Sequence, residues 1–240
     1  MWDPLEAFNW PSLYSVYDAG CGGYSNSSRC LDRFGVDRPA TDRDLYYHLL
    51  RCYSPSIRAA DADPVGTYQA LLYWKLYSSG GSKGTNILRW LAPGSEGRRS
   101  AEVVLPRLLS GLPETCPRDT QHIVSMIRDL PPIPGMGTAD ECRLPVRSTF
   151  LHFLYPETVP IFDKMVLQAV GVREPGANQD IAVFKRYLPF VWSLADRYST
   201  ASGVCSLEVP LRRIDMALWV MRDSSSGVAQ TPNRSHGHRT

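Results

Sequence analysis

The chain lacks the cysteine patterns that mark zinc and iron–sulfur proteins. Its six cysteines are scattered along 240 residues with no C-x-x-C pair, so zinc fingers, zinc ribbons and cysteine-ligated clusters are not expected. The chain also lacks a basic start followed by an apolar segment, and its apolar runs are too short to cross a bilayer. These absences favour a cytoplasmic protein with free thiols, no metal site and no membrane partner.

Lysine is scarce, since only four of the 26 basic residues are Lys. Arginine offers a fork that binds phosphate through two hydrogen bonds, although a GC-rich genome would produce the same bias. The formal net charge of +2 at pH 7 neither requires nor excludes a nucleic-acid partner. No Gly-x-Ser-x-Gly motif supports a serine hydrolase, and the GGSKGT segment at 80–85 lacks the order of a phosphate-binding loop.

Alternating apolar and polar residues, the pattern typical of strands, never persist for more than a few positions. Apolar residues instead recur at helical spacing, so we expect a mainly α protein. The apolar content of 43% fits one large domain or two closely packed small ones, which we place at residues 1–221. Residues 222–240 contain few apolar residues and are predicted to be a disordered tail. Helices are predicted at 41–52, 64–77, 86–91, 101–109, 120–130, 148–154, 164–170, 181–198 and 209–221.

The most informative stretch is 131–166, which combines three features. A small-residue turn, Gly135-Met136-Gly137, precedes an apolar helix, and a lone carboxylate, Asp163, follows in an apolar neighbourhood. A turn of this kind can bring backbone N–H groups up to a phosphate. A carboxylate just beyond the turn would then face the molecule to which that phosphate belongs, so this stretch predicts a protein that acts on nucleic acid.

The order of these features resembles the helix-hairpin-helix DNA glycosylases, whose hairpin reads roughly Leu-Pro-Gly-apolar-Gly. The matching residues are the hairpin at 133–137, the helix at 149–154, and the connection at 159–162 that ends in Asp163. The resemblance implies a two-lobed helical bundle, with the hairpin and catalytic segment at about 120–175. It also implies that hairpin amides bind the phosphates of double-stranded DNA, with a monovalent cation on the hairpin carbonyls as a candidate cofactor.

Two departures from the family's pattern affect this interpretation. Gly137 and Asp163 are 26 positions apart (163 − 137), which is longer than usual, so the true hairpin could instead lie near Arg143 to Arg147. Bifunctional members carry a lysine just after the hairpin, but this chain has Pro145, Val146 and Arg147 there. The resemblance therefore implies a monofunctional glycosylase that uses water as the nucleophile and has no Schiff-base lysine.

Asp163 is the candidate catalytic residue. Cleavage of a glycosidic bond passes through an oxocarbenium-like sugar, and a carboxylate beside C1′ stabilises that positive charge and positions water. The target base must leave the stack to be reached. The alternative is that Asp163 only caps the helix that follows, since Asp is a preferred N-cap; the two roles are compatible.

The other candidate site residues follow from the resemblance, which makes the helix at 64–77 one wall of the base pocket. Aromatic residues there could stack on a flipped base, although core packing explains them equally; Lys75 is the favoured candidate because it is the odd residue in an apolar helix. The full set of candidates for the base pocket is Tyr68, Gln69, Trp74, Lys75, Tyr77 and His152.

His152 has a simpler alternative as a hydrogen-bonded core histidine. Arg143, Arg147 and Lys164 are candidate phosphate contacts beside the hairpin residues Gly135, Met136 and Gly137, and each charge could equally be a solvated surface group.

Three functions remain open at this point. The first is a monomeric DNA glycosylase in base excision, directed at a damaged base in DNA repair or at a modified phage base in antiviral defence. The second is a non-catalytic helix-hairpin-helix DNA-binding module. The third is a helical scaffold protein without a nucleic-acid partner.

Overall fold

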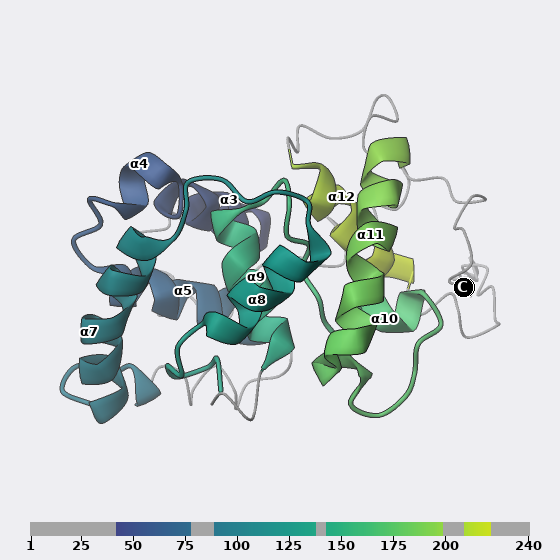
Figure 1. Ribbon diagram of the computed structural model, residues 1–240. Helices are drawn as coiled ribbons and strands as arrows, with labels where there is room; N and C mark the ends of the chain where they lie inside the picture. Colours follow the sequence, from purple (N-terminus) through teal and green to yellow (C-terminus); the bar gives the residue numbers. More distant parts are fainter. Residues whose placement is uncertain (1–41, 78–88, 138–142, 199–208, 222–240) are drawn as a thin grey trace, which may run out of the picture.

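The structure, a computed structural model, describes residues 42–77, 89–137, 143–198 and 209–221 (Figure 1). These residues are mainly helical and include no strand, which confirms the predicted mainly α class. None of the helices in these ranges is long and apolar enough to cross a membrane. The predictions for the 80–85 segment, for the start of the helix at 86–91 and for the tail at 222–240 lie outside the described residues.

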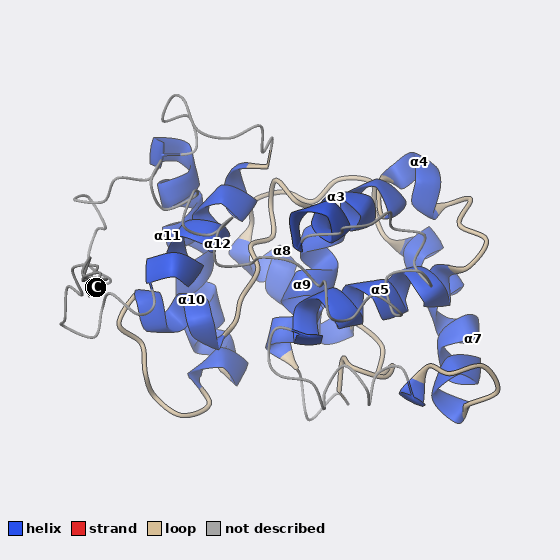
Figure 2. Ribbon diagram, turned by 180° about the vertical axis from the view of Figure 1, so that it is seen from behind, coloured by secondary structure: helices blue, strands red, loops and turns tan. Residues whose placement is uncertain are grey.

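The helices form two groups that lie side by side (Figures 1 and 2). In the first group α5 packs against α3, α7 and α9, and in the second α12 packs against α10 and α11. Helix α8 of the first group contacts α11 of the second, so the groups share an interface. The first group comprises α3 (Asp42–Cys52), α4 (Pro55–Arg58), α5 (Pro64–Tyr77), α7 (Glu96–Gly111), α8 (Thr120–Asp129) and α9 (Leu144–Leu154). The second comprises α10 (Lys164–Ala169), the 3-10 turn η3 (Ala177–Gln179), α11 (Ile181–Tyr198) and α12 (Pro210–Met221).

Helix α5 is the central helix of the first group, as its sequence predicts. It is apolar nearly all round, and Leu71, Leu72 and Tyr73 are at most 2% exposed. A helix without a polar face must be surrounded by protein. Its predicted bounds, 64–77, are confirmed.

Two helices are longer than their apolar periodicity predicts. Helix α7 begins at Glu96 because the Ser95 side chain accepts a hydrogen bond from the amide of Arg98, a typical N-cap. Helix α9 begins at Leu144, four residues before the predicted start, with Pro145 in its first turn, where a missing N–H costs nothing. The first residues of α7 are polar or glycine and carry no apolar signal, and Pro145 interrupts the pattern at the start of α9, so periodicity underestimates helix length at these ends.

The connection between α8 and α9 contains the small-residue turn. The amide of Met136 donates to the Ile133 carbonyl at 3.0 Å, and Gly135 has a φ of +96°, a region that favours glycine. A Cβ on Gly135 would lie 2.7 Å from Cδ2 of Leu72, so the turn rests directly on α5. The alternative hairpin at 143–147 is wrong, because those residues are the N-cap and first turn of α9.

Candidate functional site

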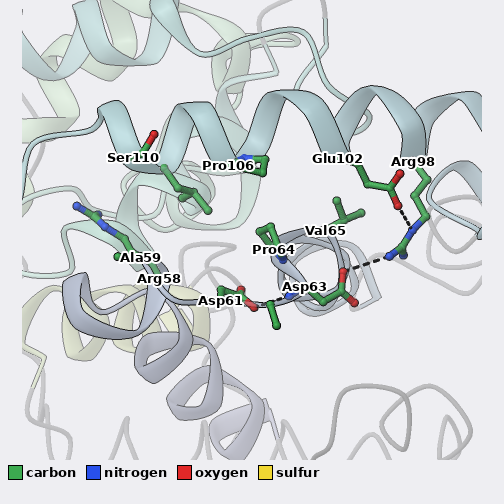
Figure 3. A pocket seen from close by; sticks show the side chains of 12 residues that line it. Arg58, Ala59, Asp61, Asp63, Pro64, Val65, Arg98, Glu102, Pro106 and Ser110 are labelled. Carbon is green, nitrogen blue, oxygen red and sulfur yellow. Dashed lines mark hydrogen bonds and ion pairs between the residues drawn. The ribbon is translucent and has the colours of Figure 1, made fainter.

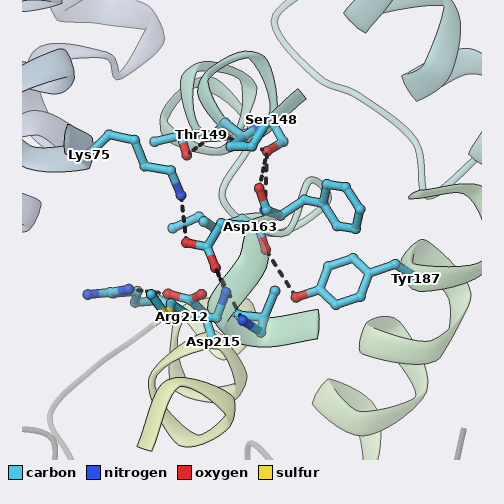
Figure 4. Close-up of polar contacts among 12 residues, drawn as sticks. Lys75, Ser148, Thr149, Asp163, Tyr187, Arg212 and Asp215 are labelled. Atoms are coloured by element: carbon cyan, nitrogen blue, oxygen red, sulfur yellow. Dashed lines mark hydrogen bonds and ion pairs between the residues drawn. The ribbon is translucent and has the colours of Figure 1, made fainter. Parts of the chain in front are cut away.

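Asp163 lies where the two groups of helices meet (Figure 4). Its Oδ1 accepts hydrogen bonds from the amides of Met165 at 2.9 Å and Val166 at 3.2 Å, so it is the N-cap of α10, as the simpler interpretation predicts. Its Oδ2 accepts a hydrogen bond from Nζ of Lys75 on α5 at 2.8 Å. The Asp163 side chain remains 25% exposed, so this helix cap is not fully buried.

The surroundings of Asp163 favour its ionised form. Burial by itself would raise the pKa of this carboxyl, but the Lys75 ammonium and the two donating amides outweigh it and hold the pKa below its usual value. Asp163 is therefore an anion at neutral pH, which is the state that stabilises a developing cation.

A second ion pair lies beneath Asp163 in α12. Arg212 and Asp215 contact each other in the interior. The Arg212 guanidinium lies over two rings, 4.9 Å from the centroid of Tyr46 and 5.0 Å from that of Trp74. Burial and the negative charge of Asp163 raise the pKa of Asp215 to about 6, although the positive charge of Arg212 acts in the opposite direction. The site thus contains two carboxylates with opposite pKa shifts.

The extended segment before Asp163 is fixed by side chains from α9 and α11. The Ser148 hydroxyl accepts a hydrogen bond from the Phe162 amide at 3.1 Å, and the Tyr187 hydroxyl donates to the Ile161 carbonyl at 3.0 Å. These bonds satisfy a buried main chain that belongs to no helix. They set the direction in which the chain enters α10, and therefore the position of Asp163.

His152 does not line a base pocket, which corrects the sequence-based prediction. It is completely buried, with Nδ1 2.7 Å from the Val159 carbonyl and Nε2 2.8 Å from the Tyr46 hydroxyl. Because a carbonyl only accepts, Nδ1 carries the proton, and Nε2 accepts from Tyr46. Burial lowers the pKa of His152 to about 3, so the ring is neutral and structural.

Tyr68 and Trp74 were also predicted to line a base pocket, and the structure places both in the core. Tyr68 is fully buried and donates to the Pro134 carbonyl at 2.8 Å, which ties α5 to the turn. Trp74 is 6% exposed and packs against Phe153. Gln69 is partly exposed on α5, and the side chain of Tyr77 lies outside the described residues. Of the predicted pocket residues, Lys75 is the one in contact with Asp163.

Arg147 does not contact phosphate from the surface, which corrects a second prediction. It is 1% exposed and donates to the carbonyls of Met136 at 2.9 Å, Ile127 at 2.7 Å and Leu130 at 2.9 Å. Ile127 is in the last turn of α8, where carbonyls have no partner within the helix. Arg147 therefore joins α8, the turn and α9 from the inside.

The turn does not fit the monovalent cation that the resemblance implies. The carbonyls of Ile133, Pro134 and Met136 already accept hydrogen bonds from protein groups. One of them bonds to the positively charged guanidinium of Arg147, which would repel a cation. We therefore assign no step to such an ion.

A groove of about 560 Å³ runs beside the turn. Gly135, Gly137 and Arg143 line it, as do Arg89 and Trp90, two exposed residues that sequence reasoning missed. An arginine next to an aromatic residue was the available signal, since both groups bind nucleic acid. Of the other predicted DNA contacts, Met136 is fully buried with its amide already bonded, and Lys164 is exposed beside Asp163.

A second hollow, of about 410 Å³, lies between the α4–α5 connection and α7 (Figure 3). Three of its charged groups form one cluster, since Arg98 contacts Asp63 at 3.1 Å and Glu102 at 2.8 Å. Asp61 accepts hydrogen bonds from the Thr67 hydroxyl and the Asp63 amide, and Arg58 donates to the Pro113 carbonyl at 3.2 Å. Because these groups bond mainly to protein, we assign no ligand to this hollow.

The comparisons with known proteins assign no family to this chain. No protein-family model matches it, and no curated protein or solved structure matches it either. In the described part of the chain, no three His, Cys, Asp or Glu residues lie where they could hold a metal ion. The geometry around Asp163 and the groove beside the turn are therefore the features that bear on function.

Sequence reasoning missed Asp215 and Arg212 although a signal existed. Both are charged residues in a segment whose other residues are mostly apolar and buried. A charged residue within an apolar helix is the feature that singled out Lys75. The same criterion, applied to α12, identifies Arg212 and Asp215.

Proposed function

We propose that this protein is a DNA glycosylase of the helix-hairpin-helix kind, which releases a damaged or modified base from double-stranded DNA. The observation that carries the proposal is the ionised carboxylate of Asp163, on a partly exposed side chain, at the meeting of the two helix groups. The sequence order of turn, helix, connection and acid supports it.

The proposed reaction requires that Asp163 place a negative charge next to C1′ of the deoxyribose. As the base departs, positive charge develops on C1′ and the ring oxygen. A fixed anion lowers the free energy of that state because it needs no reorganisation when the charge appears. The same carboxylate positions the water that adds to C1′.

The groove beside the turn is the proposed contact with the DNA strand. Arg89 and Arg143 supply positive charge, and the exposed indole of Trp90 supplies a stacking surface. Phosphates bind to such arginines through charge and paired hydrogen bonds. Lys164, exposed next to Asp163, is a further candidate phosphate contact.

The residues of α5 that were expected to stack on the base bear on the choice of substrate. The aromatic residues predicted to stack on it, Tyr68 and Trp74, belong to the core. They therefore do not select a base by stacking, and both ordinary damaged bases and the bulky modified bases that some phages carry are candidate substrates. Action on phage bases would make the protein a defence factor.

The test is base release by an Asp163→Asn variant. Asn is also a good N-cap, so the fold of α10 is retained while the negative charge is lost. Duplexes with uracil, alkylated or oxidised bases, and modified phage DNA, are incubated with the protein and treated with alkali. We expect strand breaks with the wild-type protein and a loss of about 100-fold or more in the variant.

A matched control is Asp180→Asn at the start of α11. Asp180 is an exposed aspartate that bonds to the Ala182 amide at 2.7 Å, as Asp163 bonds to the amides of α10. This variant should release the base at the wild-type rate. Retained activity in Asp163→Asn would contradict the proposed mechanism.

The second candidate function is a DNA-binding module without catalysis. It is favoured by the two amide bonds that already occupy Oδ1 of Asp163 as a helix cap. Under this alternative, DNA shifts in a gel but stays intact after alkali with every substrate tested.

A further inference from the structure

The groove beside the turn carries an aromatic side chain that the protein leaves open to solvent. Trp90 is 41% exposed, and it lines the groove of about 560 Å³ together with Arg89 and Arg143. Both arginines are exposed as well. In the described part of the chain, neither of them forms a salt bridge with a carboxylate. The groove therefore presents two positive charges and one indole to a ligand.

The turn supplies an apolar wall to the same groove. The residues of this wall have no polar side chain and are Pro132, Ile133, Pro134 and Gly135. Glu96 is the single acidic residue among the described residues that line the groove, so its formal charge is +1 (2 − 1). A ligand that complements these features carries negative charge and a flat apolar face. A nucleotide has both, in its phosphate and its base.

The indole distinguishes an unpaired nucleotide from a base pair. Within a duplex each base is covered on both faces by its neighbours, so a side chain stacks on a base only after that base has left the stack. Phosphates, in contrast, are accessible in a duplex and in a single strand. The two arginines therefore suit either form of DNA, whereas Trp90 suits only an unpaired base.

Helix α5 connects the groove to Asp163. Leu72 and Lys75 are three positions apart and therefore lie on one face of this helix. The turn rests on that face, since a Cβ on Gly135 would lie 2.7 Å from Cδ2 of Leu72, and Nζ of Lys75 is 2.8 Å from Oδ2 of Asp163. Three positions span about 4.5 Å along a helix axis, which is comparable with the distance of about 3.4 Å between successive nucleotides of a strand. One strand can thus pass both features.

We propose that the groove holds one unpaired nucleotide of the target strand, with its base on the indole of Trp90 and its phosphates on Arg89 and Arg143. The substrate is then double-stranded DNA that is open beside the target base, as in a bubble, rather than a continuous duplex. This inference rests on the proposed function, which supplies the target base at Asp163. Binding of the unpaired nucleotide itself requires no base release.

The experiment measures the affinity of the full-length protein for two DNAs of equal length that carry no modified base. One is a continuous duplex, and the other has a short central bubble made by mismatches. Fluorescence anisotropy should show about ten-fold tighter binding to the bubble. Trp90→Ala should weaken binding to the bubble by about ten-fold and binding to the duplex by less than about two-fold. Trp90→Phe keeps a stacking ring and should retain most of the preference for the bubble.

Val103→Ala on α7 is the matched control. Val103 is 55% exposed and does not line the groove, so the loss of this apolar surface should leave both affinities unchanged. A second measurement uses the wild-type protein and does not depend on the folding of a variant. An iodinated uracil in the bubble is cross-linked to the protein by ultraviolet light, and peptide mass mapping of the adduct should identify Trp90.

Equal affinity for the two DNAs would overturn the proposal, and so would a cross-link outside the groove or equal weakening of both complexes by Trp90→Ala. A dimer that Trp90→Ala dissociates, seen by sedimentation, would assign the groove to a second copy of this chain. Because affinity is measured without base release, the two proposals fail separately. Base release without a preference for the bubble would remove only this inference. A preference for the bubble that depends on Trp90, without release of any base, would support it and contradict the glycosylase.

Discussion

Replacement of Arg147 by Met should destabilise the protein strongly, because Arg147 is an internal link between α8, the turn and α9. Its guanidinium donates three hydrogen bonds of 2.7–2.9 Å to the main chain. The Met side chain has similar length and no donor. The carbonyls of Ile127, Leu130 and Met136 would lose these charged partners inside the protein.

The magnitude follows from those three carbonyls. A buried carbonyl left without its partner costs about 1–3 kcal/mol, so three cost about 3–9 kcal/mol. Burial of the apolar Met side chain and relief from burying a charge offset part of this loss. We expect a net loss of about 3–5 kcal/mol in the free energy of unfolding, or roughly 10 °C in melting temperature for a chain of this size.

Urea denaturation followed by circular dichroism measures this loss, with Arg143→Met as the control. Arg143 is exposed at the N-cap of α9 and its side chain makes no cap hydrogen bond, so its removal should change stability by less than about 0.5 kcal/mol. If Arg147→Met were as stable as the wild type but bound DNA more weakly, the phosphate-contact interpretation would be right and the internal link wrong.

Three further outcomes are expected. Gly135→Ala should lower the free energy of unfolding by about 2–4 kcal/mol, measured by thermal melting, since its Cβ would meet Leu72 at a φ of +96°. Gly94, with a φ of +80° and open space around it, is the control, and Gly94→Ala should cost about 1 kcal/mol. Equal losses in the two variants would refute the close approach of Gly135 to Leu72. The His152 pKa of about 3 lies below its ordinary 6.5, so the unfolded state binds the extra proton and stability should fall as pH drops from 6.5 towards 3. Asp215, whose pKa is raised to about 6, binds a proton more readily in the folded state and opposes this loss of stability below about pH 6. Urea midpoints of the wild type are therefore compared with those of His152→Gln, which should depend less on pH. Arg143→Ala should reduce the slope of DNA affinity against salt by about 1 without loss of stability; an unchanged slope would remove Arg143 from the interface.

The helices were largely predictable because their signals are local. The apolar periodicity of α8 and the apolar run of α5 depend on residues a few positions apart, and their observed bounds, Thr120–Asp129 and Pro64–Tyr77, agree with the prediction within a residue. The early start of α9 was missed because its first turn contains Pro145, and proline usually signals the end of a helix.

The site was predictable only in part. Asp163 could be identified as a helix cap because an N-cap is a local motif. The roles of Arg147, Tyr68 and His152 were wrongly predicted because residue type does not reveal burial. A charged or aromatic side chain is equally compatible with a surface contact and with a hydrogen bond to distant main chain.

The amino-acid pattern alone was enough to show that this chain is helical, to place most of its helices, and to offer a helix cap as one of two roles for Asp163. The contact of Lys75 with Asp163, the Arg212–Asp215 pair beneath it and the internal position of Arg147 became evident only in the folded protein. The physical reason is range: helix formation depends on neighbours within four residues, whereas the electrostatics of a site depend on charges that the packing of distant helices brings within a few ångströms.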